Sequence, residues 1–253
     1  MKIGRAQDVS ATHIVGDAGR RRDCATLADH APAIPTYLEQ VYWWAYIHPA
    51  AVRLFERQWL LELILFGNYG RLRDATLAEL GATVTGRTLQ VACAYGDLTP
   101  RLHERLGARA SLDVVDVLPI QLRNLASKLP ADPRVTLVQS DACALPFADD
   151  HYDQVLLFFL LHEQPRHVRR ATLSEAMRVV KPGGKVVIVD YHRPVRLHPL
   201  RPLLAGIFRK FEPYALDMWE HEIVDFLVAD PKLSSLQKNT WFGGLYQKLV
   251  LTR

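Results

Sequence analysis

The chain has 253 residues, of which 49% are hydrophobic and 23% are charged. A chain of this length and composition can bury a sizeable core, which excludes a largely disordered protein and favours one α/β domain with an added helical part. The net charge of +4 is compatible with an anionic membrane surface. Without any nucleic-acid-binding motif, it is too weak to indicate a nucleic-acid partner.

Three cysteines lie far apart in the chain, at Cys24, Cys93 and Cys143. They form no CxxC pair, so the sequence predicts neither a disulfide framework nor a zinc site, and it favours a reducing compartment. The N-terminus has no apolar signal core and no apolar run is long enough to cross a bilayer, so we expect a cytoplasmic protein without a spanning helix. Residues 1–33 show no periodicity and predict a poorly ordered tail.

Residues 34–81 predict a helical extension ahead of the main domain. We expect an aromatic-rich helix that ends before Pro49, then a helix with an apolar stripe, then a short third helix. The stripe consists of Val52, Phe55, Trp59, Leu63 and Phe66. In the simplest interpretation the extension packs on the main domain. Two more specific interpretations stay open: the extension is a lid over an apolar substrate, or one of its faces lies in the bilayer interface, where Trp and Tyr are favoured.

Residues 82–253 alternate between strand and helix patterns. Strands are expected at 88–92, 112–116, 135–139, 152–159 and 185–190, with helices between them at 98–106, 119–129 and 167–180. This alternation predicts an α/β fold with a doubly wound, mostly parallel sheet whose ligands bind at the carboxyl ends of the strands. Two β-rich runs joined at Gly243-Gly244 predict a C-terminal antiparallel hairpin.

A helical insertion is expected at 195–229, between the last parallel strand and the hairpin. Its first part, 195–211, contains basic residues and no acid among Leu, Ile and Phe. Such a segment can lie on anionic lipid headgroups or can be an ordinary solvated helix, and the sequence leaves both open. His221 and Glu222, later in the insertion, could close over the site, although a charged helix face explains them more simply.

The stretch 88–99 combines a buried strand, a sharp turn and the start of a helix, with Asp97 or Thr99 placed to cap that helix. A strand–turn–helix unit of this kind binds nucleotide-like ligands at the helix N-terminus. Asp116 ends the next strand about 20 residues after Gly96, the spacing at which a carboxylate accepts hydrogen bonds from ribose hydroxyls. The alternative for Asp116 is a solvated strand end.

Three motifs carry a resemblance to a known family. They are Val-Ala-Cys-Ala-Tyr-Gly-Asp-Leu-Thr at 91–99, Leu-Phe-Phe-Leu-Leu-His-Glu-Gln-Pro at 157–165 and Val-Asp-Tyr-His-Arg-Pro at 189–194. The first resembles the opening motif of class I S-adenosylmethionine (SAM) methyltransferases, with Gln90 in place of the usual acid and alanines at 92 and 94 in place of two glycines. Together the three motifs resemble the rhodoquinone biosynthesis proteins, a divergent branch of that class, over roughly residues 34–253.

The resemblance implies a Rossmann-like SAM site. Asp116 would hold the ribose, Val117 would lie against the adenine, and Asp141 would accept a hydrogen bond from the adenine amino group unless it is only a turn or cap residue. The alanines and Tyr95 add bulk where the methionine end of SAM usually lies. Either that end is held differently, with Tyr95 contacting it or the acceptor, or the site tolerates the bulk. The expected cofactor-binding residues are Ala92, Ala94, Tyr95, Gly96, Asp97, Asp116, Val117, Asp141, Ala142 and Phe158.

A second group of polar residues lies at the ends of two neighbouring strands. His162 and Glu163 follow the fourth strand, and Asp190 and His192 end the fifth. Because adjacent parallel strands end at the same edge of a sheet, these side chains should lie close together. They suit general acid–base chemistry or a divalent metal such as Mn²⁺, whereas a lone histidine at a strand end is usually a polar cap. We expect His162, His192 and Tyr95 to be catalytic, and His162, Glu163, Asp190 and His192 to bind the metal.

For activity, the resemblance implies conversion of ubiquinone to rhodoquinone, in which an amino group replaces a ring methoxy group. SAM would be the amino donor, Mn(II) a second cofactor, and the protein would associate peripherally with the inner membrane. The residues by themselves predict an ordinary SAM methyltransferase acting on a quinone or an apolar phenol. A hypothesis of another class is a non-catalytic SAM-binding module that docks on membranes. The sequence leaves the oligomeric state open.

Overall fold

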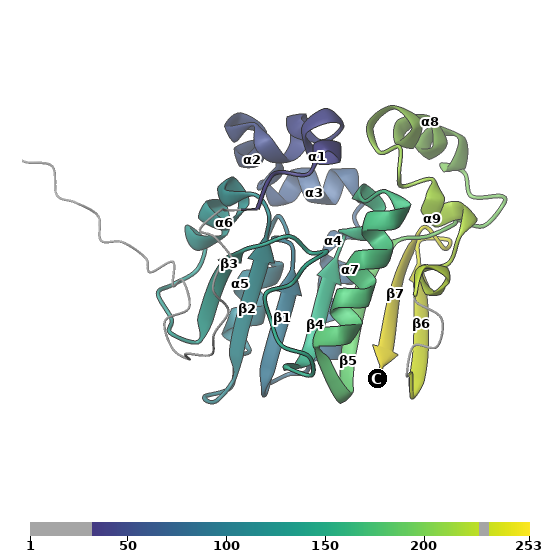
Figure 1. Cartoon of the computed structure of the whole chain (residues 1–253). Helices are drawn as coiled ribbons and strands as arrows, with labels where there is room; N and C mark the ends of the chain where they lie inside the picture. The colour runs from purple at the N-terminus through teal and green to yellow at the C-terminus, as the bar shows by residue number, and fades with distance from the viewer. Residues whose placement is uncertain (1–31, 228–232) are drawn as a thin grey trace, which may run out of the picture.

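The computed structural model describes residues 32–227 and 233–253, so the predicted tail at 1–33 lies almost wholly outside the described residues. Within them the strands form one seven-stranded sheet in the order β3-β2-β1-β4-β5-β7-β6 (Figure 1). The strands are β1 (Arg87–Val91), β2 (Ser111–Asp116), β3 (Val135–Gln139), β4 (Tyr152–Phe158), β5 (Val180–Tyr191), β6 (Ser235–Trp241) and β7 (Tyr246–Thr252).

The first five strands are parallel, and β7 runs antiparallel to both β5 and β6. This confirms the expected doubly wound, mostly parallel sheet with a C-terminal antiparallel hairpin. β5 begins earlier than expected because Val180 already pairs with Tyr152, ahead of a register shift. The order of the strands reverses between β1 and β4, and ligands bind in the crevice at such a reversal.

Helices cover both faces of the sheet and one of its ends. The described helices are α1 (Thr36–Gln40), α2 (Pro49–Phe55), α3 (Gln58–Ile64), α4 (Tyr69–Leu80), α5 (Leu98–Glu104), α6 (Pro119–Ala126), α7 (Arg166–Val179), α8 (Arg201–Phe211) and α9 (Asp217–Glu220), with the shorter turns η1 (Trp43–Ile47), η2 (Leu161–Glu163) and η3 (Ile223–Phe226). Figure 1 shows α7 in front of the sheet, α4 behind it, and α1, α2, α3 and α8 at the end where the parallel strands finish. None of the described helices is long and apolar enough to cross a membrane.

The N-terminal extension is more broken than its pattern predicts. The first expected helix is α1 followed by the π-helical turn η1, and the second is split at Arg57, whose backbone is extended. The split resets the helical phase, so Trp59 and Leu63 of the expected stripe are 59% and 65% exposed, while Leu61 and Leu65 are buried. The predicted continuous stripe is therefore wrong for α3.

Glu56, at the end of α2, ties the extension to the main domain. Its Oε1 accepts hydrogen bonds from Gly96 N at 3.1 Å and from Lys128 Nζ at 2.8 Å, and its Oε2 accepts one from Asn124 Nδ2 at 2.7 Å. Charge-assisted bonds of this kind are stronger than neutral ones. The loop after β1 is thus held from above by a carboxylate of the extension.

The N-terminus of α5 is capped by Tyr69 of α4 and not by Asp97 or Thr99 as expected. The Tyr69 hydroxyl accepts hydrogen bonds from the backbone N–H of Asp97 at 3.0 Å and of Leu98 at 3.2 Å, and donates to the carbonyl of Tyr95 at 3.2 Å. Asp97 instead pairs through its carboxylate with two arginines, and Thr99 donates to a buried glutamine. A hydroxyl from another helix therefore satisfies backbone groups that a local cap usually serves.

This packing makes Gly96 a structural glycine, which a substitution can test. Gly96 has φ of +80°, and a Cβ built there would lie 2.5 Å from the Tyr69 hydroxyl oxygen. Gly183 is the matched control, because its φ is +78° and a Cβ there would meet nothing. We expect Gly183→Ala to cost about 1–3 kcal/mol of unfolding free energy from backbone strain. Gly96→Ala should cost about 1–3 kcal/mol beyond that from the clash.

Chemical denaturation of both variants measures the difference. Equal losses of stability would show that Tyr69 does not pack against Gly96 in solution.

Candidate active site

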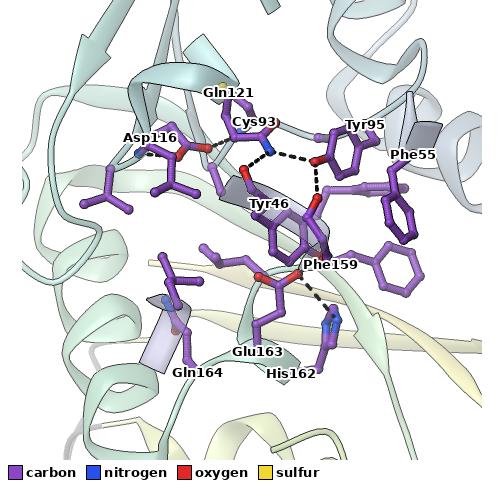
Figure 2. A pocket seen from close by; sticks show the side chains of 18 of the residues that line it. Tyr46, Phe55, Cys93, Tyr95, Asp116, Gln121, Phe159, His162, Glu163 and Gln164 are labelled. Carbon is purple, nitrogen blue, oxygen red and sulfur yellow. Dashed lines mark hydrogen bonds and ion pairs between the residues drawn. The ribbon is translucent and has the colours of Figure 1, made fainter. Parts of the chain in front are cut away.

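A pocket lies at the carboxyl ends of β1, β2 and β4, under the N-terminal extension, with a cavity of about 180 Å³. This is below the usual range for ligand pockets of roughly 300–1,000 Å³. Figure 2 shows why: the side chains of Tyr46 and Tyr95 reach into it. Of the expected site residues, those that line the pocket are Ala92, Ala94, Tyr95, Asp116, Val117, Asp141, Ala142, Phe158, His162 and Glu163.

Asp116 lies at the end of β2 and is buried in the pocket wall. Its Oδ2 accepts a hydrogen bond from Cys93 N and its Oδ1 one from Leu118 N, both at 2.8 Å. Burial raises the pKa of this carboxyl to about 6, despite the two backbone bonds. A carboxylate has about four lone-pair sites, so Asp116 can still accept hydrogen bonds from a ligand.

Asp141 follows β3 and lines the same pocket. Its Oδ1 accepts a hydrogen bond from Cys143 N at 2.9 Å, which is the turn geometry that the sequence left open as the alternative. The turn places Asp141 beside Ala142, and Val117 and Leu118 form an apolar wall on the side of β2. An acid at each of two strand ends with an apolar wall between them fits an adenosine group.

Gly96 and Asp97 do not line the pocket. Gly96 lies against Tyr69, and Asp97 forms an ion pair with Arg73 at 2.8 Å and another with Arg101 at 2.5 Å. Both residues were expected to bind the cofactor. In the structure they contact side chains of α4 and α5 and do not face the pocket, because α4 packs directly on the loop after β1.

Tyr95 forms the centre of an aromatic stack. Its ring lies 5.7 Å from Tyr46 at an interplanar angle of 9° and 6.0 Å from Phe55 at 23°. Its hydroxyl donates to the carbonyl of Ala45 at 2.8 Å and accepts from Gln121 Nε2 at 2.7 Å. Burial is the main reason that the pKa of Tyr95 is raised, so the phenol stays neutral. Figure 2 shows the side chains of Tyr46, Tyr95 and Phe55 together at one side of the pocket.

His162 and Asp190 form a buried pair at the ends of β4 and β5. Asp190 is fully buried, and its Oδ1 accepts a hydrogen bond from His162 Nδ1 at 2.9 Å. The same carboxylate accepts from the backbone N–H of Leu161 at 2.8 Å and of Tyr191 at 2.7 Å. Burial by itself lowers the pKa of His162, but the carboxyl groups of Asp190, Glu163 and Glu212, with Asp190 contributing most, together raise it to about 9. His162 is therefore an imidazolium near neutral pH.

Two further acids face the other nitrogen of this imidazole. His162 Nε2 lies 3.7 Å from Glu163 Oε1 and 3.9 Å from Glu212 Oε2. Burial raises the pKa of Glu163 to about 8, and it also raises the pKa of Glu212. The Tyr46 hydroxyl donates a hydrogen bond to Glu163. The group can hold and release protons near neutral pH, which is what general acid–base chemistry requires.

His192 does not join this group, contrary to expectation. Its Nδ1 lies 2.8 Å from the carbonyl oxygen of Gly244, and its Nε2 lies 2.9 Å from Lys238 Nζ and 3.3 Å from Glu222 Oε1. These contacts direct His192 toward the C-terminal hairpin. His192 is not among the pocket-lining residues, and Asp190 lies beneath His162 without lining the pocket either.

The expected four-ligand manganese set is therefore not assembled. Across residues 32–227 and 233–253, no three or more His, Cys, Asp or Glu side chains are arranged to hold a metal ion. The carboxylate of Asp190 already accepts hydrogen bonds from η2 and from His162, and His192 contacts the carbonyl of Gly244. The residues present do not fit the metal, and no step is assigned to one.

The sequence did not indicate several residues of the site. Glu212 follows the basic helix α8, and no spacing or motif links it to His162. Gln164 lies in the second motif, but the sequence suggested no role for it. In the structure it lines the pocket, and its Oε1 is a buried acceptor that has no hydrogen-bond partner. Tyr46 belongs to the aromatic-rich pattern. Only the π-helical turn η1, a form often found at functional sites, directs it toward Glu163.

Residues 88–184 match a family of methyltransferase domains. The chain is 32% identical over 158 residues to the ubiquinone/menaquinone biosynthesis C-methyltransferase UbiE of Syntrophotalea carbinolica, covering 62% of this chain and 63% of that protein. It is 30% identical over 152 residues to a demethylmenaquinone methyltransferase of Staphylococcus aureus, covering 60% of this chain and 61% of that protein. The chain thus spans about three fifths of the length of these relatives.

Solved structures of methyltransferases share the fold. Human N-acetylserotonin methyltransferase in complex with SAM superposes with a TM-score of 0.60 at 13% identity, covering 87% of this chain and 60% of that one. An O-methyltransferase family protein from Burkholderia thailandensis gives 0.59 at 18% identity, covering 80% and 59%. Residues 88–184 thus match a methyltransferase domain in sequence, and the chain shares the fold of these solved methyltransferases.

The residues that match the methyltransferase family contain only part of the pocket. Asp116, Asp141, His162 and Glu163 lie within the matched residues, whereas Tyr46 and Glu212 lie in the N-terminal extension and the helical insertion outside them. The matches support the coarser of the two resemblances, to class I methyltransferases. Membership of the rhodoquinone biosynthesis family stays a prediction.

The pair of His162 with Asp190 predicts a measurable change in proton affinity. Asp190→Asn keeps the shape of the side chain but removes the negative charge, so the pKa of His162 should fall by about 1–3 units. NMR titration of the imidazole, assigned by its loss in a His162→Gln variant, measures the shift. Asp141→Asn, which removes a pocket carboxylate that does not bond to His162, should leave it unchanged. If the pKa of His162 in Asp190→Asn equals the native value, the pairing is disproved.

The raised pKa values of Glu163 and His162 predict a stability that falls with rising pH. A group whose pKa is higher in the folded than in the unfolded state stabilises the fold below its unfolded pKa. That stability is lost as pH rises through its folded pKa, which is about 8 for Glu163 and about 9 for His162. The unfolding free energy should therefore be lower at high pH than at mildly acidic pH.

Glu163→Gln should reduce this loss by more than about 1 kcal/mol, because an amide cannot ionise. Urea denaturation across the pH range measures it. Glu104→Gln, on the exposed side of α5, is the control and should leave the pH dependence as it is. If the Glu163→Gln variant keeps the native pH dependence, ionisation of Glu163 does not cause the loss of stability at high pH.

Proposed function

We propose that the protein transfers a group from SAM to a quinone-type ring. The observation that carries this proposal is the meeting, in one pocket, of an acid at the end of β2 with a buried imidazolium at the end of β4. The first suits an adenosine group and the second suits a polar oxygen on a flat apolar ring. The relatives named as quinone-biosynthesis methyltransferases support the choice of acceptor.

The adenosine part of SAM fits the residues present. Asp116 has lone pairs left for the ribose hydroxyls, and Val117 offers an apolar wall for the adenine. The unpartnered Oε1 of Gln164 can accept a hydrogen bond from an amino group. A buried acceptor without a partner costs free energy, so a ligand donor there would be favourable.

The methionine end has less room in the described conformation. Gly96 N is bonded to Glu56, the N-terminus of α5 is bonded to Tyr69, and the Tyr95 ring covers the loop. A molecule as large as SAM therefore has to displace Tyr46 or Tyr95, or place its methionine end elsewhere. This supports the hypothesis that the methionine end is held in an unusual way.

The acceptor ring would lie among the aromatic side chains, with its oxygen toward His162. Aromatic rings stack well on one another, and the pocket-lining rings of Tyr46 and Phe159 supply such faces. With its pKa raised to about 9, His162 can donate a proton from Nε2 to a developing oxyanion. Asp190 holds the opposite nitrogen, so the donating nitrogen is Nε2.

SAM supplies either an electrophilic methyl group or, in the amination implied by the resemblance, its α-amino nitrogen. Methyl transfer requires a ring carbon or hydroxyl that loses a proton, and Glu163, beside His162, can accept one. Amination requires the amino nitrogen to be free of its proton and aimed at a ring carbon that carries a methoxy group. The new C–N bond forms as the methoxy group leaves as methanol, and the bond between the nitrogen and the α-carbon of SAM must then break. One observation supports amination as the second candidate. The backbone N–H groups of Gly96, Asp97 and Leu98 already bond to Glu56 and Tyr69, so they are not available to hold the methionine end in the usual way.

The test is the fate of label from SAM. The protein is incubated with SAM carrying either a deuterated methyl group or a ¹⁵N amine, using short-tail ubiquinone or a demethylated quinol as acceptor, with and without Mn(II). Deuterium in the product indicates methyl transfer, and ¹⁵N indicates amination. SAM binding without transfer to any acceptor would contradict the proposal and favour the non-catalytic module.

His162→Gln should lower kcat by about 10²–10⁴ while SAM affinity stays near native, because the imidazolium acts on the acceptor. Glu222→Gln, which alters the separate group around His192, is the matched control and should retain turnover. Full activity of His162→Gln would place the chemistry elsewhere.

A further inference from the structure

The large apolar side chains left exposed are concentrated at one end of the molecule. Among the described residues, all of them except Leu236 belong to the segments 43–64 and 195–211. We call these two segments the apical surface. Figure 1 shows α2, α3 and α8, which make up most of it, at the end where the parallel strands finish. Trp59 is 59% exposed, Leu63 65% and Leu197 91%.

The apical surface is basic as well as apolar. Arg53, Arg57, Arg196, Arg209 and Lys210 are exposed on it. The segment 195–211 contains no acid. The two glutamates of 43–64 bond to backbone N–H groups, Glu56 to Gly96 and Glu62 to Gly70. The apical surface therefore presents cations without free carboxylates between them.

An arginine-lined hollow lies beside α8. Arg193, Arg201 and Arg209 line it together with Trp219, and Glu220 is the one acid among its lining residues. The Arg201 guanidinium lies 5.7 Å from the centre of the Trp219 ring, which holds it at the wall. Several guanidinium groups around one hollow are suited to a phosphate group. The hollow and the apolar side chains of α8 thus offer a phosphate site next to an apolar one.

The apical surface is continuous with the pocket. The rings of Trp44 and Phe211 lie 5.7 Å apart and join its two segments, and Trp44 also lines the pocket. Ile64 is 39% exposed and lines the pocket as well. Glu212, the residue after Phe211, faces His162. An apolar molecule can therefore pass from the apical surface to the acid–base group along one apolar wall.

We infer that the apical surface docks on an anionic lipid bilayer, and that the pocket receives its acceptor directly from that bilayer. The second part rests on the proposed function, since a quinone with a long apolar tail partitions into lipid. Exposed tryptophans and leucines beside arginines are the combination that binds the headgroup region. The charge argues against a second copy as the occupant, because a two-fold contact would bring the same cations face to face.

Cosedimentation with vesicles tests the docking. The native protein should bind phosphatidylcholine vesicles containing phosphatidylglycerol and bind pure phosphatidylcholine weakly. The double variant Trp59→Ser/Leu63→Ser should lower the partition coefficient at least about tenfold. The double variant Arg196→Gln/Arg209→Gln should lower it about fivefold per arginine, and only with anionic vesicles.

Matched controls carry the same changes outside the apical surface. Leu236→Ser removes an exposed leucine from the edge strand β6, and Arg87→Gln/Arg109→Gln removes two exposed arginines near the opposite ends of β1 and β2. Both should bind vesicles as the native protein does. Equal binding by the apical and control variants would overturn the inference, and so would light scattering that shows a dimer dissociated by Trp59→Ser/Leu63→Ser.

Turnover with two acceptors separates this inference from the proposed function. The apical variants should keep native activity on a short-tail quinone in solution and lose it on a long-tail quinone in vesicles. Native activity of these variants on both acceptors would overturn docking while the proposed function stands. No transfer by the native protein to either acceptor would defeat the proposed function, and vesicle binding would still decide the docking by itself.

Discussion

One fully buried carboxylate, that of Asp190, holds the acid–base end of the pocket together. It accepts hydrogen bonds from three backbone N–H groups of η2 and β5 and from His162 Nδ1. An unpaired charge at this depth would cost several kcal/mol, so the imidazole is held as a cation next to it. The turn after β4, the orientation of His162 and its proton all follow from this one contact.

The hydrogen-bonding groups of the loop after β1 are satisfied by side chains of the chain itself. Glu56 bonds to Gly96 N, Tyr69 bonds to the start of α5, and Tyr95 stacks between Tyr46 and Phe55. Backbone donors that could serve a ligand are thus engaged by side chains of the N-terminal extension. Binding of a large cofactor is therefore coupled to the position of that extension.

The extension and the helical insertion, both outside the matched methyltransferase domain, connect the chemistry to the proposed docking surface. The same two segments supply Tyr46 and Glu212 to the pocket and carry the exposed apolar and basic side chains. Trp44 and Phe211 meet between them. Elements outside the matched residues thus add Glu212 to the acid–base group and provide the apolar side chains that lead to the pocket.

The sequence by itself determined the sheet, because the alternation of apolar strands with amphipathic helices has few physical solutions, and it placed Asp116 and His162 at strand ends. It could not separate His192 from His162. Both follow parallel strands, and only the turn between β6 and β7 supplies the Gly244 carbonyl that directs His192 away. Nor could it join Glu212 to His162 or Tyr46 to Glu163, since those contacts cross long stretches of chain and depend on how η1 and α8 pack. Local patterns fix which residues form a strand or a helix, whereas the neighbours of a buried polar group are decided by tertiary packing and by the need to pair every buried charge.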